Sequence, residues 1–302
     1  MSRRAATSVT AAAWDIAFGS LKLRVSELGA EMLSLRFAGK ELLWQGDEAF
    51  WRDRAPNLFP YIGRLSRGMY TYKGKTYRLD IHGFAKDSLM TPIRREESSI
   101  CFRFESDAES LSGYPFPFVY NVCYGLSEGR LSVRYLVENT GESAMYFGIG
   151  GHPGFGLPMD KGLIFEDYYL EFSESCFPRR ILFSDERFVL GTEEFPLARG
   201  RRLPLDHRLF DRDAIVLKSG SGAVALQSDK GSLWLELDYS GFPYLGIWHT
   251  PGADAPFVCL EPWSSLPSRQ GLIEEITEQP GLVALRKGEM YENEWHITIT
   301  AG

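Results

Sequence analysis

Apolar and polar residues alternate in many short runs along this chain of 302 residues. A period of two places alternate side chains on opposite faces of a β-strand. Glycine-containing turn segments, such as residues 38–40, 73–75 and 127–129, separate the runs. The clearest of roughly a dozen runs are residues 21–25, 33–37, 100–104, 118–124, 131–137, 233–237 and 295–299.

Helical periodicity is weak throughout the sequence, apart from one short turn expected near residues 272–277. Strands that follow one another without intervening helices favour an antiparallel sandwich or barrel over a parallel α/β sheet. No internal repeat, low-complexity tract or Pro/Ser-rich linker divides the chain. We therefore predict one large all-β domain over residues 1–302, with few short helices and a frayed N-terminus over residues 1–13.

The composition is that of a globular protein with a sizeable core, because 44% of the residues are hydrophobic and only 24% are charged. The 40 acidic and 33 basic side chains give a net charge of −7, and no Lys/Arg-rich block stands out. We therefore expect no nucleic-acid partner. The longest apolar runs are far shorter than a bilayer span, so we also expect no membrane association.

The four cysteines are few for this length and form no CxxC pair: Cys101, Cys123, Cys176 and Cys259. This usage predicts buried, reduced thiols in a cytoplasmic protein. The N-terminal segment is too short and too weakly apolar in its middle for a secretory signal, so we expect no export.

Two of the five histidines stand in glycine-rich turns. His82 lies within Asp-Ile-His-Gly-Phe-Ala, residues 80–85, and His152 lies within Gly-Gly-His-Pro-Gly-Phe, residues 150–155. The glycines leave space around each imidazole, and the proline fixes the turn that carries His152. One histidine of this kind is more often structural than catalytic, but two in one chain favour a functional site.

Glu261 ends the apolar segment Phe-Val-Cys-Leu-Glu-Pro-Trp, residues 257–263, just before a proline that stops the strand. Shielding by Trp263 would raise the pKa of Glu261, which suits a general base near neutral pH. The structural alternative is an ion pair with a neighbouring arginine. Arg64, which follows Gly63, is either a solvated turn charge or a forked donor for a sugar hydroxyl or an anion.

Several catalytic motifs are absent from the sequence: GxGxxG, GxxxxGK[ST], GxSxG and HExxH. His82, His152 and Glu261 are far apart in the sequence, but metal ligands need only meet in space. A metalloenzyme with a His-His-Glu site is therefore an alternative to acid–base chemistry.

Five segments resemble the aldose 1-epimerase (mutarotase) family, in particular its shorter bacterial branch. In family order they are residues 57–64, 72–77, 82–84, 150–155 and 261–263. The resemblance implies an antiparallel β-supersandwich of the galactose mutarotase type, which agrees with the all-β prediction. It also implies interconversion of the α and β anomers of a hexose, with a sugar as the only partner and no cofactor or metal.

The resemblance also implies roles for individual residues. Glu261 matches the family's general base, and His152 matches its general acid. His82 and Arg64 match the residues that hold sugar oxygens. Better-known galactose mutarotases have Asn where this chain has Gly63 and His-Gly-Gly where it has His-Gly-Phe, which puts a preference for galactose in doubt.

The family uses one further Asp, between the second histidine and the glutamate, to contact a sugar hydroxyl. Asp213 is the first candidate for this Asp, and Asp238 is the second. Trp51, Trp248 and Trp263 are candidates to stack on the apolar face of the sugar, although core packing is an alternative for each.

In the implied mechanism, Glu261 removes the proton of the C1 hydroxyl while His152, as an imidazolium, protonates the ring oxygen. The open-chain aldehyde rotates about C1–C2 and closes from the opposite face. Acid and base then titrate as a coupled pair, so we expect a bell-shaped pH–rate profile within roughly pH 5 to 9.

Two other functions remain open. A non-catalytic carbohydrate-binding sandwich would use the same aromatic side chains without turnover. A hexose-6-phosphate 1-epimerase would need a cation at the distal end of its pocket, for which Lys86, Arg179 and Arg269 are candidates. The sequence does not determine which sugar is the substrate. It also does not distinguish a monomer from a homodimer.

Overall fold

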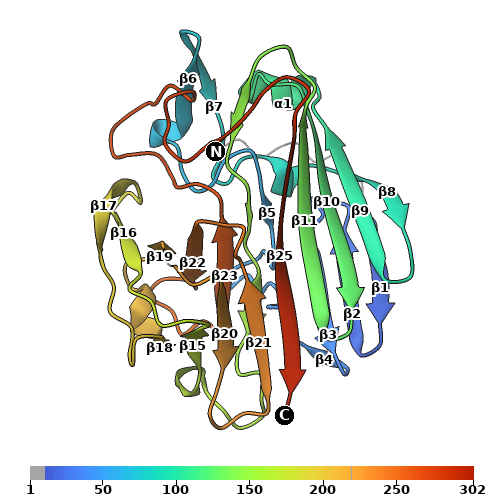
Figure 1. Ribbon diagram of the computed structural model, residues 1–302, viewed down its shortest axis with the longest axis vertical. Coiled ribbons are helices and arrows are strands. Elements are labelled where there is room, and N and C mark those ends of the chain that lie inside the picture. Colours follow the sequence, from blue (N-terminus) through green and yellow to red (C-terminus); the bar gives the residue numbers. More distant parts are fainter. Residues whose placement is uncertain (1–10, 219) are drawn as a thin grey trace.

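The computed structural model describes residues 11–218 and 220–302, and they form mainly antiparallel strands (Figure 1). The predicted all-β antiparallel fold is confirmed, and each run named above lies within a strand. In β10 (Phe118–Ser127), for example, buried and half-buried residues alternate almost to the end of the strand. The period of two in the sequence therefore corresponds to an inner and an outer face of each strand.

The largest sheet has nine strands, and its long members β25, β11 and β10 form the broad surface seen in Figure 1. In spatial order the strands are β18 (Arg202–Pro204), β15 (Tyr169–Phe172), β20 (Ala223–Gln227), β21 (Leu233–Asp238), β25 (Met290–Ala301), β11 (Arg130–Asn139), β10, β9 (Ser99–Glu105) and β8 (Thr91–Arg95).

The second sheet has eight strands and carries most of the segments that the sequence analysis singled out. In spatial order they are β17 (Val189–Glu194), β16 (Arg179–Phe183), β19 (Ile215–Lys218), β22 (Tyr244–Trp248), β23 (Phe257–Trp263), β13 (Gly150–Gly151) and β5 (Asn57–Leu58), with β14 (Gly154–Gly156) also paired to β23.

The remaining strands form one small sheet and two ribbons. They are β1 (Ala13–Phe18), β2 (Leu21–Ser26), β3 (Met32–Phe37) and β4 (Lys40–Glu41); β6 (Met69–Tyr72) with β7 (Lys75–Arg78); and β12 (Met145–Phe147) with β24 (Val283–Leu285). The α-helix α1 (Ala108–Gly113) begins where the Asp107 carboxylate accepts a hydrogen bond from the backbone of Ser110. Short 3₁₀ turns cover Ser66–Gly68, Ala85–Asp87, Phe165–Asp167 and His207–Phe210.

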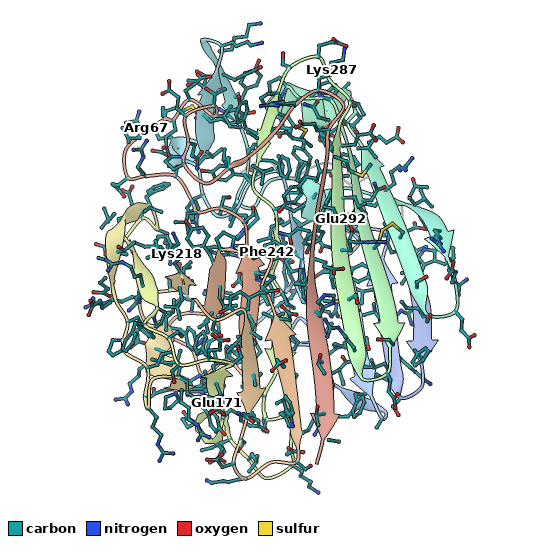
Figure 2. All side chains as sticks on the ribbon, in the orientation of Figure 1. Arg67, Glu171, Lys218, Phe242, Lys287 and Glu292 are labelled. Atoms are coloured by element: carbon teal, nitrogen blue, oxygen red, sulfur yellow. A yellow bond between two sulfur atoms is a disulfide. The ribbon has the colours of Figure 1, made fainter. Side chains whose placement is uncertain are left out.

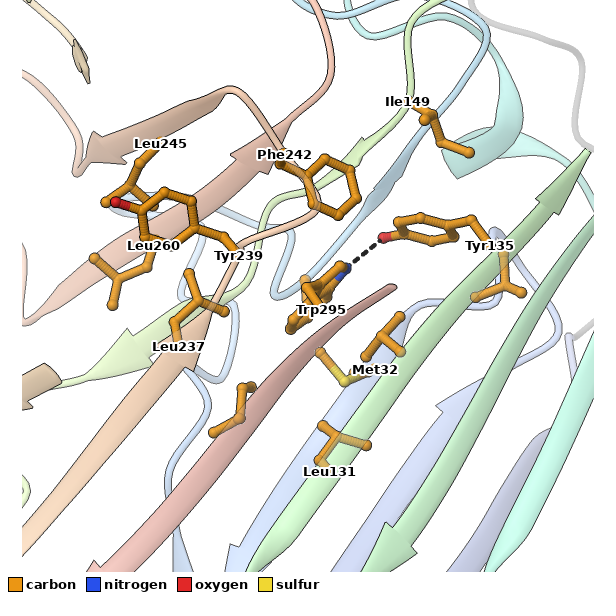
Figure 3. Packing of buried hydrophobic residues seen from close by; sticks show 14 of the residues in the cluster. Met32, Leu131, Tyr135, Ile149, Leu237, Tyr239, Phe242, Leu245, Leu260 and Trp295 are labelled. Atoms are coloured by element: carbon orange, nitrogen blue, oxygen red, sulfur yellow. Dashed lines mark hydrogen bonds between the residues drawn. The ribbon is translucent and has the colours of Figure 1, made fainter. Parts of the chain in front are cut away.

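The main core lies between the sheets. Side chains from the nine-stranded sheet, such as Leu237, pack in one cluster with side chains from the eight-stranded sheet, such as Leu245 and Leu260 (Figure 3). Figure 2 shows Phe242 in the middle of the molecule and the charged Lys287 near one end. This burial of apolar surface is the main stabilising contribution to the fold.

Strand β23 is buried along its whole length and presents different residues to its two sides. Val258 and Leu260 belong to the main core, whereas Cys259 packs in a separate cluster with Trp44 and Phe257. Because side chains alternate along a strand, Glu261 lies on the same side as Cys259. The face of the eight-stranded sheet that is turned away from the main core therefore carries Glu261.

One prediction of local structure is confirmed in part and one is wrong. The short turn expected near residues 272–277 lies at residues 276–278, where the Glu278 amide donates to the Glu275 carbonyl at 2.9 Å. Backbone hydrogen bonds from Thr71 to Glu274 and from Ile276 to Thr71 hold this segment against β6. Residues 11–13 of the predicted frayed segment are also held, since the Glu27 amide donates to the Ala12 carbonyl at 2.9 Å. Residues 1–10 lie outside the described residues.

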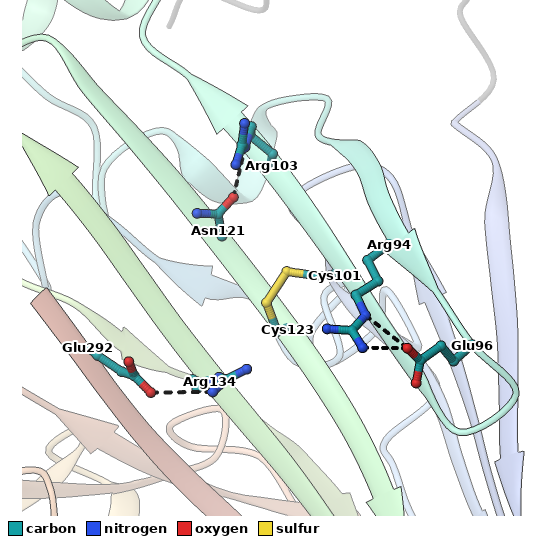
Figure 4. Close-up of a disulfide and its surroundings, with 8 residues drawn as sticks. All are labelled: Arg94, Glu96, Cys101, Arg103, Asn121, Cys123, Arg134 and Glu292. Carbon is teal, nitrogen blue, oxygen red and sulfur yellow. Dashed lines mark hydrogen bonds and ion pairs between the residues drawn. A yellow bond between two sulfur atoms is a disulfide. The ribbon is translucent and has the colours of Figure 1, made fainter. Parts of the chain in front are cut away.

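The expectation of four reduced thiols is wrong for one pair. Cys101 on β9 and Cys123 on β10 are directly opposite in the antiparallel register, with Cα atoms 4.0 Å apart, and they form a disulfide (Figure 4). Cys176 and Cys259 are free. The two cysteines are brought together only by the pairing of β9 with β10. These strands are separated by α1 and not by a tight turn, so nothing in the sequence indicates that they pair. The cysteine content therefore no longer supports the expected cytoplasmic location.

In the described part of the chain, no helix has both the length and the apolar character that a membrane span requires.

Candidate active site

The pairing of two short strands with β23 places His152 opposite Glu261. Gly150 of β13 pairs with Trp263, and Gly154 of β14 pairs with Cys259. The turn between them, which carries His152, therefore lies level with Glu261. Nε2 of His152 is 3.1 Å from Oε2 of Glu261.

Glycine is required beside His152 because the backbone approaches its neighbours closely. A Cβ atom on Gly150 would lie 2.4 Å from the Pro262 carbonyl oxygen, and one on Gly151 would lie 2.9 Å from the Trp295 ring. The Gly150 carbonyl also accepts a hydrogen bond from the Tyr135 hydroxyl, which in turn accepts one from the Trp295 indole (Figure 3). The main core thus fixes the strand that precedes His152.

Glu261 and His152 are both buried, with 1% and 8% of their surfaces exposed. The Trp263 indole donates a hydrogen bond to Oε2 of Glu261 at 3.1 Å. Trp263 therefore both shields the carboxyl group and orients it. The alternative prediction of an Arg–Glu261 ion pair is wrong, since the partners of Glu261 are His152 and Trp263.

Burial favours the uncharged forms of both groups. It raises the pKa of Glu261 well above its ordinary range and lowers the pKa of His152 to about 3. Both shifts favour a protonated Glu261 beside a neutral His152. The contact of 3.1 Å between the two side chains is close enough for them to share one proton and to titrate as a coupled pair.

His82 lies on the turn after β7, with its ring centre 5.6 Å from that of His152. The backbone amide of Gly63 donates to Nδ1 of His82 at 3.2 Å, and the His82 amide donates to the Gly63 carbonyl at 3.0 Å. Because Nδ1 accepts this hydrogen bond, the proton of the neutral ring is on Nε2. Burial lowers the pKa of His82 well below 6.5, with further contributions from His152, Lys86 and Arg64. His82 is therefore a neutral hydrogen-bond donor.

Asp213 is held from two sides. The Trp248 indole donates to its Oδ1 at 2.8 Å, and the Arg187 guanidinium forms an ion pair with its Oδ2. The backbone of Asp213 has a φ of 82°, in the left-handed region, where its amide donates to the Phe210 carbonyl. Asp213 is thus a fixed carboxylate.

These side chains line one cavity of about 300 Å³. His82, His152, Glu261, Trp263 and Asp213 all contribute to its wall, as does Arg64. Two larger grooves of about 730 and 410 Å³ lie over β1 to β3, but their lining residues include no histidine and no aromatic side chain. The smaller cavity therefore has the chemistry of a functional site.

Three cationic side chains also reach the cavity: Arg64, Lys86 and Arg187. Arg187 neutralises Asp213, and Lys86 contacts Asp87 at 2.7 Å. Arg64 takes part in none of the ion pairs within the described residues. Its pKa is lowered by burial and by the positive charge of Arg187.

Three candidate residues lie elsewhere. Arg179 contacts Thr192, and Arg269 pairs with Glu274, so neither lines the cavity. Asp238 lies on β21 beside Arg130, at 3.8 Å, and is also absent from the cavity wall. Of the three cations proposed to bind a phosphate, only Lys86 lines the cavity. Of the two candidate aspartates, only Asp213 lines it.

All three candidate tryptophans line the cavity. Trp51 lies along one face of His152, with ring centres 4.9 Å apart, and Trp248 meets the same ring edge-on at 5.6 Å. Both are half-buried, whereas Trp263 is only 5% exposed. Trp51 and Trp248 therefore offer more ring surface for a ligand than Trp263.

Arg187 is one of the cavity residues that the sequence analysis missed, as is Asp53. Arg187 lies in the tight turn between β16 and β17, with a φ of 68°, and its amide donates to the Ser184 carbonyl. An arginine in a polar turn carries no sequence signal for a site. Only the position of this turn over Asp213 reveals its role.

The set of metal-ligating atoms differs from the predicted one. Donor atoms of His152, Cys259 and Glu261 lie within 4.8 Å of one another, and His82 is not among them. Burial raises the pKa of the Cys259 thiol well above its ordinary value. The His-His-Glu set predicted from the sequence is therefore not the set that the structure brings together.

Comparison with known proteins identifies the family. A sequence profile of the aldose 1-epimerase family matches residues 14–298. The chain belongs to the aldose 1-epimerase family. This member is 32% identical over 291 residues to the plasmid-encoded protein LacX of Lactococcus lactis subsp. lactis, covering 92% of this chain and 96% of LacX.

Two solved structures support the assignment of this aldose 1-epimerase family member. A galactose mutarotase related enzyme from Lactobacillus acidophilus superposes with a TM-score of 0.92 at 31% identity, covering 96% of this chain and 98% of that one. A galactose mutarotase-like protein from Lactobacillus casei gives 0.91 at 32% identity, covering 95% and 100%. The resemblance inferred from five short segments is thus confirmed along nearly the whole chain.

Proposed function

We propose that this protein is an aldose 1-epimerase, an isomerase that interconverts the α and β anomers of an aldose by opening and closing the ring. The observation that carries this proposal is the buried pair of Glu261 and His152, 3.1 Å apart, in the wall of a cavity lined by tryptophan and polar side chains.

The reaction requires an acid and a base side by side. In a cyclic aldose the C1 hydroxyl and the ring oxygen are bound to the same carbon atom. A base at one oxygen and an acid at the other must therefore be neighbours, as Glu261 and His152 are. Such positioned groups each contribute about 10²- to 10⁴-fold to the rate.

The neutral pair already holds the proton that the reaction needs. Protonated Glu261 with neutral His152 contains as many protons as a Glu261 carboxylate with a His152 imidazolium. When the sugar binds, transfer of one proton from Glu261 to His152 creates the base and the acid without exchange with solvent. Glu261 then takes the C1 hydroxyl proton while His152 protonates the ring oxygen as the C1–O bond breaks.

Ring opening returns the pair to its resting protonation, with the proton on Glu261 and His152 neutral. The open-chain aldehyde rotates about C1–C2. His152 then removes the proton of the former ring hydroxyl as it attacks C1, and Glu261 protonates the carbonyl oxygen. The product is the opposite anomer.

The other cavity residues hold the sugar while C1 turns. Nε2 of His82 donates a hydrogen bond, and Arg64 supplies a forked donor. Asp213 accepts a hydrogen bond from a sugar hydroxyl with the lone pairs that Trp248 and Arg187 leave free. Trp51 and Trp248 stack on the apolar face of the ring. Two further protein contacts, from Trp263 and Gly63, keep Glu261 and His82 in place.

A phosphorylated hexose is the second candidate substrate. The observation in its favour is that Arg64, Lys86 and Arg187 all line the cavity. Two of these cations have carboxylate partners, so the excess positive charge comes from Arg64. We therefore place the unphosphorylated aldose first.

Anomer exchange measured by NMR tests the proposal. Magnetisation transfer between the α and β anomeric protons of glucose, galactose and glucose 6-phosphate should accelerate with enzyme for at least one sugar. Binding without exchange for every sugar would favour a carbohydrate-binding module. Exchange that disappears after treatment with a chelator, together with a bound metal, would favour the metalloenzyme.

A further inference from the structure

A pair of histidines lies behind the cavity wall and takes no part in the reaction described above. Nδ1 of His207 is 3.0 Å from Nε2 of His249, and Nδ1 of His249 is 2.8 Å from the Thr250 carbonyl oxygen. His249 is fully buried. Nε2 of His207 faces the Glu166 carboxylate at 3.9 Å.

The direction of these hydrogen bonds follows from the carbonyl, which can only accept. Nδ1 of His249 must therefore carry a proton, and in the neutral ring Nε2 is an acceptor. His207 then donates from its Nδ1. The arrangement is a directed chain from His207 through His249 to the backbone of Thr250.

Aromatic packing holds both rings in place. Phe165 stacks on His207 with ring centres 4.1 Å apart, and Phe210 lies 4.1 Å from His249. Phe165 and Phe210 are themselves buried. The only charged group that an ion-pair distance links to the two rings, within the described residues, is Glu166.

Both histidines are connected directly to the sugar site. His249 follows Trp248 in the chain. His207 begins the 3₁₀ turn that ends at Phe210, and the Phe210 carbonyl accepts the amide of Asp213. Trp248 and Asp213 then meet in the cavity through their own hydrogen bond of 2.8 Å.

We propose that His207 and His249 are positioning residues for the sugar site, which fix Asp213 against Trp248 by tying the 3₁₀ turn to the end of β22. The proposal rests on the proposed function for its kinetic consequence. Loss of the His207–His249 hydrogen bond loosens the Asp213–Trp248 contact and weakens sugar binding. The acid–base pair at C1 is left unchanged.

The substitution His207→Phe tests this directly, because it removes the donor and keeps a ring that stacks on Phe165. We expect KM to rise about tenfold, the size of one lost hydrogen bond, with kcat and the pH profile little changed. His207→Asn retains a donor near the position of Nδ1 and should restore KM. His296→Phe is the matched control, since His296 contacts Ser132 at 3.1 Å on the nine-stranded sheet and its KM should equal that of the wild type.

A double-variant cycle shows whether His207 acts through Asp213. If it does, adding His207→Phe to Asp213→Asn should raise KM little further, because the contact is already lost. Additive effects, or an unchanged KM with only a lower melting temperature, would overturn the proposal and leave a stabilising role.

A spectroscopic readout separates this proposal from the proposed function. The indole N–H resonance of Trp248, assigned with Trp248→Phe, should move when His207→Phe is introduced, whether or not the protein epimerises any sugar. In the wild type at neutral pH, imidazole ¹⁵N shifts should show His249 protonated on Nδ1. A proton on Nε2 of His249 would overturn the hydrogen-bond direction even if the variants fail to fold.

Discussion

Nε2 of His152 lies 3.1 Å from Oε2 of Glu261, and the register of β13 and β14 on β23 fixes this distance. The contact is buried, and burial favours a protonated Glu261 beside a neutral His152. Because both groups are uncharged, the pair avoids the cost of a buried ion pair. Substrate oxygens replace this contact when the ring of the sugar enters the cavity.

The shared proton determines how the rate should depend on pH. A second proton enters only near the lowered pKa of His152, about 3, and the shared proton is lost as pH rises through the raised pKa of Glu261. We therefore expect kcat/KM to stay level below neutral pH and to fall on the alkaline side. The acid limb of the bell-shaped pH–rate profile that was expected from the sequence therefore moves to lower pH. An acid limb centred near 6.5, the ordinary value for histidine, would contradict the single-proton pair.

Asp213 should contribute to sugar binding, whereas Asp238 should not. In Asp213→Asn the ion pair with Arg187 is lost, and we expect KM to rise about 10- to 100-fold, as for hydrogen bonds to charged groups. Asp238→Asn is the matched control, because it changes an equally small group outside the cavity. Steady-state kinetics of both variants decide the matter. A larger effect of Asp238→Asn would transfer the role to that residue.

Local pattern in the sequence was enough to predict the strands and the all-β antiparallel class. The period of two predicts strands such as β2 and β10, because the buried and exposed faces of a strand appear as alternating residues within its own sequence. The contact between His152 and Glu261 depends on which strands pair and in which register, and this is not written in either segment alone. Only the resemblance to a family suggested that the two residues act together.

Residues whose role comes from tertiary placement were missed. Nothing in the sequence distinguishes Arg187 from the other arginines. Its role depends on the turn between β16 and β17, which places it against Asp213. The sequence around His249 gives no sign of a partner, and only the fold brings His207 within 3.0 Å of it. The disulfide requires Cys101 and Cys123 to be opposite each other across two strands separated by α1.

The number of free thiols tests that disulfide. Denatured, unreduced protein should react at two cysteines, Cys176 and Cys259, and at all four after reduction. Cys101→Ser should release Cys123 and give three reactive thiols. The separation of 22 residues predicts a loss of about 3 kcal/mol in the free energy of unfolding on reduction. Four reactive thiols without reductant would contradict the pairing.

Burial of Glu261 should lower stability at high pH. The folded-state pKa of Glu261 is raised, so its contribution is fully present below the unfolded value of about 4.5 and is lost as pH rises toward the folded value. Glu261→Gln removes this loss. Near pH 7 we expect the variant to have a higher melting temperature than the wild type. Its free energy of unfolding should exceed that of the wild type by up to about 1.4 kcal/mol for each pH unit above 4.5. Near pH 4.5 the two proteins should melt at the same temperature.

Glu128 provides the control for that comparison, since it lies exposed in the turn after β10. Glu128→Gln should leave the melting temperature unchanged at both pH values. A Glu261→Gln variant that melts lower than the wild type at neutral pH would mean that the folded protein keeps Glu261 ionised.

Polarimetry on freshly dissolved α-anomers tests the central claim most directly, because it follows anomer interconversion itself. Wild-type protein should accelerate mutarotation of at least one of glucose, galactose and glucose 6-phosphate. Glu261→Gln and His152→Gln should each reduce kcat by about 10²- to 10⁴-fold, while Glu128→Gln keeps full activity. Loss of activity in both site variants, with sugar binding retained, is the result that the structure predicts. Undiminished mutarotation in either variant would contradict the assignment of Glu261 and His152 as the acid–base pair.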